Sequence, residues 1–181
     1  SASTPENDSW TAIRANEGAT VRLTDCEVRH GVGVVLNAAK IASTERCVFK
    51  NNWRGIGGYA ESVTVRDCVL EANENGAEFN GSLSAMISGN SFRGGKHAFW
   101  GRDLKGLTLA GNTFADHSDY AALLNGTITA PAIRDNVGNG GGRRHLRFSS
   151  CSLDGSTALG ENPGLPYLLS EHQNYPPPLV P

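Results

Sequence analysis

The sequence predicts an all-β fold, a solenoid in which short strands stack coil upon coil. Three observations predict it. The chain of 181 residues holds 22 glycines and one methionine, a composition that favours many tight turns over a bundle of helices. One octapeptide pattern recurs along most of the chain, about 22 residues apart. A second short apolar segment follows each copy, so one unit holds two strands and two corners.

The first half of each unit has the pattern apolar-x-apolar-x-x-(Cys or Asn)-x-apolar. The Cys or Asn falls at positions 26, 47, 68, 90, 112, 136 and 151, in steps of 21, 21, 22, 22, 24 and 15. Five near-equal steps indicate a structural repeat, and the short last step indicates that it degenerates near residue 140.

We expect this position to form a thiol column followed by an amide ladder, because an Asn side chain both donates and accepts hydrogen bonds. The expected members are Cys26, Cys47, Cys68, Asn90, Asn112 and Asn136. Stacked Cβ vectors run parallel and do not converge, which argues against disulfides between these cysteines. The thiols are therefore expected to be free and buried.

The second half of each unit is a short strand, often led by Gly, that starts about eight residues after the Cys or Asn. Alternation along these strands places Trp100 inside and Phe99 outside. His97 and Tyr120 stand where other copies begin with Gly, which makes them functional candidates. The strand copies are residues 33–36, 55–58, 76–79, 97–100 and 120–123.

This repeat resembles that of the pectate-lyase-like superfamily, over residues 19–137 and more weakly over 138–153. The resemblance implies a right-handed parallel β-helix of about six to seven coils. That superfamily includes polysaccharide lyases and hydrolases, mannuronan epimerases, phage tailspikes, copper-maturation periplasmic proteins and partner-binding domains, so it implies a fold more than an activity. Residues 104–114 also fit a leucine-rich repeat, but the glycine-rich second half of residues 54–58 favours the β-helix.

Three segments are expected: a tail over residues 1–9, a parallel β-helix over 10–153, and a Pro-rich tail or cap over 154–181. No capping helix is visible ahead of Trp10, and an open solenoid end exposes strand edges and core. We therefore expect the chain to be cut from a longer β-helix, or its N-terminal coil to be buried against a partner, end to end.

Charge and motifs exclude several classes of function. A net charge of −2 provides no general field for nucleic acid. No apolar run approaches the roughly 18 residues of a membrane span. No Cys or His spacing is typical of zinc, so neither a metal nor another cofactor is expected. Glu78 is the one acidic residue in the outward column, which argues against calcium-dependent lysis.

The richest cluster of chemical side chains spans the corners of two neighbouring coils. Lys96 and Arg102 would supply charge to an acidic sugar, while an aromatic ring would supply a stacking surface. The ligand-binding candidates are Lys96, His97, Phe99, Arg102, Asp119 and Tyr120. Catalytic candidates, if the face acts on a sugar, are Tyr120 or His117 as the base and Arg102 as the group that stabilises negative charge.

Three functions stay open at this point. Short turns and sparse acidic residues favour a non-catalytic module that binds a polysaccharide or a protein. Family resemblance and the cluster around His97, His117 and Tyr120 support a polysaccharide lyase or uronate epimerase. The third alternative is a purely structural segment of an assembly.

Overall fold

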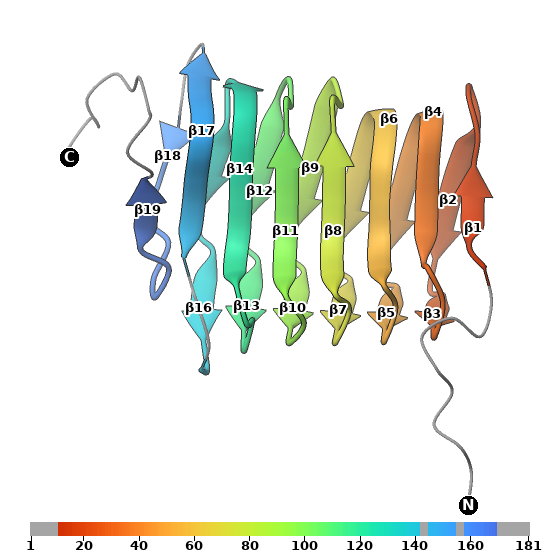
Figure 1. Ribbon diagram of the computed structural model, residues 1–181, viewed down its shortest axis with the longest axis horizontal. Helices are drawn as coiled ribbons and strands as arrows, with labels where there is room; N and C mark the ends of the chain where they lie inside the picture. Colours follow the sequence, from red (N-terminus) through yellow and green to blue (C-terminus); the bar gives the residue numbers. More distant parts are fainter. Residues whose placement is uncertain (1–10, 142–144, 155–157, 170–181) are drawn as a thin grey trace, which may run out of the picture.

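The computed structural model describes residues 11–141, 145–154 and 158–169, and it confirms the parallel β-helix (Figure 1). Every strand pairing is parallel, and no helix occurs among these residues. The second half of each unit is a strand, so residues 104–114 belong to the β-helix and not to a leucine-rich repeat. None of the described segments is a helix that could span a membrane.

Six coils follow one another, and a further partial coil succeeds them. The first coil comprises β1 (Ile13–Ala15), β2 (Thr20–Thr24) and β3 (Glu27–Arg29). The second and third comprise β4 (Val34–Glu45) with β5 (Val48–Lys50), and β6 (Arg54–Arg66) with β7 (Val69–Glu71).

The fourth coil comprises β8 (Asn75–Asn80), β9 (Ser84–Ser88) and β10 (Ser91–Arg93). The fifth comprises β11 (His97–Arg102), β12 (Leu107–Ala110) and β13 (Thr113–Ala115). The sixth comprises β14 (Tyr120–Thr129), β15 (Ala132–Arg134) and β16 (Val137–Asn139), and then come β17 (Leu146–Asp154), β18 (Ala158–Leu159) and β19 (Tyr167–Leu169).

The strands form three flat faces. The front sheet, nearest the viewer in Figure 1, runs through β1, β4, β6, β8, β11, β14, β17 and β19. The back sheet runs through β2, β4, β6, β9, β12, β15 and β18, and long strands such as β4 and β6 turn the corner between the two. The third sheet is six-stranded and runs from β3 to β16. We call the outward surface of the front sheet, over β6 to β17, the front face.

Identical positions of successive coils stack in the interior. In the third sheet, Phe49, Leu70, Phe92 and Phe114 form one inward row, and each is almost fully buried. The rings of Phe92 and Phe114 lie parallel, with their centroids 5.1 Å apart. Such rows fill the narrow space between the sheets with apolar area and account for most of the driving force for folding.

The amide ladder is present as expected. Asn90 Nδ2 donates to Asn112 Oδ1 at 3.0 Å, and Asn112 Nδ2 donates to Asn136 Oδ1 at 2.9 Å. The ladder then continues to Asn162, which accepts from Asn136 Nδ2 at 2.7 Å. The assignment of Cys151 to this column was wrong, because Cys151 lies within β17 opposite Gly126 and the true step is 26 residues.

The cysteines are free, as expected. Cys47 and Cys68 are buried in the column, and the backbone N–H of Cys47 donates to the sulfur of Cys68 at 3.4 Å. Cys26 is only half-buried, because it belongs to the first coil and no described coil lies beyond it. The expectation that all three column thiols are buried therefore holds for two of them.

Candidate binding face

The register of the front sheet places the polar side chains in rows. His97 of β11 pairs with Asn75 of β8 on one side and with Tyr120 of β14 on the other. Asn75 in turn pairs with Arg54 of β6. His97 and Tyr120 thus continue a row of large polar residues. They were expected to replace a corner glycine such as Gly76. That expectation was wrong by one residue, because His97 pairs with Asn75, the residue before Gly76.

That one-residue shift reverses which side chains of β11 face outward, because strand neighbours point to opposite faces. Phe99 is 0% exposed and lies in the core, so its assignment to the binding face was wrong. Trp100 is half-buried and shares an outward row with Glu78 and Leu123. Gly101 faces inward, where a Cβ would lie 2.8 Å from a methyl group of Leu104.

An ion pair occupies the part of the face nearest the N-terminal coils. Arg54 Nη2 lies 2.8 Å from Glu78 Oε2, and Asn75 Nδ2 donates to the same oxygen at 3.3 Å. The Arg54 side chain is only 14% exposed and its guanidinium also covers the Trp53 ring, 4.8 Å from the centroid. Gly57 leaves room for this arrangement, because a Cβ there would lie 2.6 Å from Arg54 Cδ.

His97 forms the centre of the face. Its Nε2 lies 3.6 Å from Asp119 Oδ2, and its ring lies parallel to the Tyr120 ring with centroids 6.1 Å apart. Burial lowers the pKa of His97 below its ordinary value, and the nearby Asp119 opposes that shift. The imidazole is therefore neutral at neutral pH.

Two buried polar atoms on β8 and β11 have no hydrogen-bond partner in the structure: Nδ1 of His97 and Oδ1 of Asn75. Both side chains are 8% exposed, and the two residues are register partners on neighbouring strands. A buried polar group without a partner costs free energy, so a ligand that satisfies such groups gains affinity.

Tyr120 is held by the next coil. The Arg147 guanidinium donates to its hydroxyl and also covers the ring, 4.8 Å from the centroid. Two aromatic rings and an imidazole, each fixed by a neighbouring strand, therefore line the outside of β11 and β14. Rigid strands position such groups more accurately than loops do.

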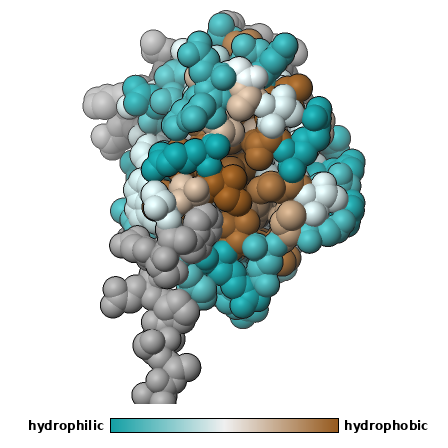
Figure 2. All heavy atoms as spheres, turned by 90° about the vertical axis from the view of Figure 1, so that its right-hand side faces the viewer, coloured by the Kyte–Doolittle hydropathy of each residue, from teal (hydrophilic) through white to brown (hydrophobic). Residues whose placement is uncertain are grey.

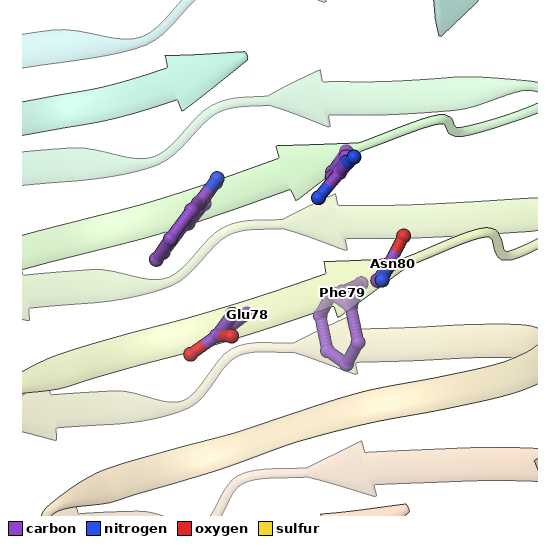
Figure 3. Close-up of a pocket in the computed structure, with 5 residues that line it drawn as sticks. Glu78, Phe79 and Asn80 are labelled. Carbon is purple, nitrogen blue, oxygen red and sulfur yellow. The ribbon is translucent and has the colours of Figure 1, made fainter. Parts of the chain in front are cut away.

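A shallow hollow of about 130 Å³ adjoins the indole of Trp100. The indole Nε1 donates to Asn125 Oδ1 at 3.0 Å, which fixes the ring against β14. Figure 3 shows Glu78, Phe79 and Asn80 in succession along β8 at this hollow. The residues that line it are Glu78, Phe79, Asn80, Trp100 and Arg102.

The structure separates the predicted catalytic residues from one another. His117 is 1% exposed and points into the interior, where Nδ1 donates to the Gly94 carbonyl at 2.7 Å. Tyr120 pairs with His97, whereas Arg102 pairs with Asn125. These two rows are five residues apart along the strands, about 16 Å at the rise of an extended strand. This separation disfavours a shared role of Tyr120 and Arg102 at one sugar carbon.

Lys96 and Arg102 are both exposed, at opposite ends of β11, and Asp119 is half-buried beside His97. Arg102 Nε lies 3.3 Å from Asp103 Oδ2, so its charge is partly balanced. The residue that sequence alternation missed is Trp100. Phe79, Gly101 and Leu124 align as one inward row and so fix the register of β11. In that register the neighbouring Trp100 points outward, and this alignment is the sequence signal that could have identified it.

The family model of the periplasmic copper-binding protein (NosD) matches residues 3–138, about three quarters of the chain. The chain belongs to the NosD family. Neither the curated proteins nor the solved structures contain a match to it. NosD membership agrees with the β-helix that the repeat predicts and with the stacked coils of the structure.

The described residues of this NosD chain do not fit a resident copper ion. Copper prefers His, Cys and Met ligands, and no group of three or more His, Cys, Asp or Glu side chains among those residues is arranged to hold a metal. The single methionine, Met86, lies apart on β9. Cys47 and Cys68 lie inside the column, and burial raises the pKa of both thiols, which keeps them protonated.

Proposed function

We propose that this NosD-family chain is a non-catalytic β-helix module that binds a polysaccharide on its front face. The observation that carries the proposal is Trp100, an outward indole fixed by Asn125 beside a hollow that Glu78, Asn80 and Arg102 also line. The apolar C–H face of a pyranose stacks on an aromatic ring, and its hydroxyls need hydrogen-bonding groups around that ring.

The surroundings of Trp100 provide such groups. Glu78 and Asn80 line one side of the hollow, and Arg102 closes its end. The unpartnered atoms of Asn75 and His97 lie toward the other end of the strands. Because the strands are rigid and their side chains are mutually paired, little conformational entropy is lost when a ligand binds.

Binding is favoured over turnover by the placement of the candidate bases. His117 lies inside the coil, and Tyr120 is already bonded to Arg147. Tyr120 does not line the hollow beside Trp100, whose row lies three residues further along β14. Incubation with uronate polysaccharides, with and without calcium, should therefore release no unsaturated product that absorbs in the ultraviolet.

A glycan array followed by titration calorimetry tests the proposal. The wild-type chain should bind at least one polysaccharide, and Trp100→Ala should weaken that binding about tenfold or more, since buried aromatic anchors dominate binding energy. Met86→Ala is the matched control, because Met86 is 46% exposed on the back sheet. Absence of any glycan ligand, or unchanged affinity of Trp100→Ala, contradicts the proposal.

A further inference from the structure

The N-terminal end of the solenoid exposes three strand edges. β1 and β2 pair only with β4, and β3 pairs only with β5. Among the described residues, no strand covers their opposite edges. Each of these edges carries backbone N–H and C=O groups that can extend a sheet.

The same end exposes the core. Figure 2 looks onto this end and shows an apolar patch at its centre, surrounded by hydrophilic side chains. Five apolar residues of the first coil pack on the core yet are only partly buried, whereas the matching rows of the next coils are mostly buried. They are Ile13, Ala19, Val21, Leu23 and Cys26. A central apolar patch with a polar rim is typical of a protein interface.

The other end of the solenoid is built differently. The N–H of Asp135 donates to the Glu161 carbonyl at 2.7 Å, and that of Gly138 donates to the Pro163 carbonyl at 2.8 Å. Leu165 is 2% exposed and closes the interior there. Prolines lack the N–H that a strand edge needs, so this end is a poor template for sheet extension.

We propose that the N-terminal end binds a second copy of this chain, head to head about a two-fold axis. Such an axis lies in the end plane and makes the facing edge strands antiparallel, an arrangement in which strand edges can form ladder hydrogen bonds. A second copy has the same cross-section and the same apolar patch. It therefore continues the sheets and covers the core at once.

The rim charges fit a self-complementary contact. The described first coil carries three basic and three acidic side chains, of which Glu27 pairs with Arg29, and Asp25 pairs with Arg46 of the second coil. The rim is therefore close to neutral, and two copies can meet there without net repulsion. The six residues are Arg14, Glu17, Arg22, Asp25, Glu27 and Arg29. A uniformly charged rim would instead have repelled a second copy.

Sedimentation velocity of the full chain over a range of concentrations tests this proposal. The wild type should be a dimer at micromolar concentration. Leu23→Lys should raise the dissociation constant about a hundredfold or more, since it places an unpaired charge inside the contact. In the monomer the lysine stem can lie over the patch with its ammonium group in water, so the fold should persist. Met86→Lys, on the back sheet, should remain dimeric.

Hydrogen exchange supplies a second measurement that needs no variant. The edge amides of β2 should exchange more slowly as the wild-type concentration rises. A wild type that is monomeric throughout, a Leu23→Lys variant that is folded and still dimeric, or open-ended polymers that indicate head-to-tail stacking would each overturn the proposal. Circular dichroism of each variant confirms the fold.

Discussion

A single asparagine of the ladder satisfies polar groups of the two coils on either side of its own. Asn112 is fully buried, and its Nδ2 donates to the Ile87 carbonyl at 2.9 Å and to Asn136 Oδ1. Its Oδ1 accepts from both the backbone N–H and the Nδ2 of Asn90, each at 3.0 Å. Because these groups are shut off from water, the ladder makes the stability of each corner depend on its neighbours.

Asn112→Ala should therefore lower the free energy of unfolding by about 1–3 kcal/mol, the cost of leaving buried groups without partners. Asn37→Ala is the matched control, because Asn37 is exposed and its Nδ2 donates to Asn16 Oδ1 of the adjacent coil at 3.4 Å. Urea denaturation of the two variants measures the difference. Equal stability of both would show that the ladder contributes nothing.

His117 occupies the corner row in which earlier coils place Asn52 and Asn73. These two asparagines form a second amide ladder, which the repeat pattern in the sequence did not reveal. Asn52 Nδ2 donates to Asn73 Oδ1 at 3.0 Å. Burial lowers the pKa of His117, so the folded state keeps it neutral while the unfolded state gains a proton near the ordinary value of about 6.5. Since the unfolded state then binds more protons, stability is lost as pH falls below that value.

His117→Asn should consequently fold and show a weaker loss of stability between about pH 7 and pH 5 than the wild type does. Denaturation midpoints at several pH values across this range measure it. The His97→Gln variant should also reduce the pH dependence, because burial lowers the pKa of His97 as well. An unchanged pH profile in His117→Asn would refute the assignment.

At the scale of strands, the spacing of the Cys and Asn residues predicted the coils, because one position per coil is fixed by a buried corner. It also predicted the inward residues of β6 and β8, such as Ile56 and Phe79. It failed for β11 and β14, because His97 and Tyr120 were aligned with the glycine that follows Asn75, whereas they lie in the row of Asn75 itself. That shift buried Phe99 and exposed Trp100.

The thiol column yields a prediction at the same scale. Cys26 should react first with a thiol reagent in the native protein, because it is half-buried in the first coil. Cys47 and Cys68 should react slowly, since both are buried and their pKa values are raised. The same holds for Cys151, whose pKa burial raises to about 11. Timed alkylation with peptide mapping resolves the four sites. Rapid modification of Cys68 would contradict the stacked column.

At the scale of the whole molecule, three flat sheets leave the front face and the N-terminal end as the two surfaces with distinctive chemistry. The front face combines aromatic rings with paired charges across the coils from β6 to β17. The end instead combines strand edges with an apolar patch. The degeneration of the repeat near residue 140 hid the last rung, Asn162, because its coil is longer than the others.

The central claim is that a polysaccharide binds beside Trp100, and nuclear magnetic resonance of the indole N–H groups tests it most directly. The chain has three tryptophans, and Trp→Phe variants assign their signals. On titration with a glycan that the array identifies, the Trp100 signal should shift and saturate. The Trp53 signal should move little, because the Arg54 guanidinium already covers that ring. A bound glycan that leaves the Trp100 signal unmoved would contradict the account.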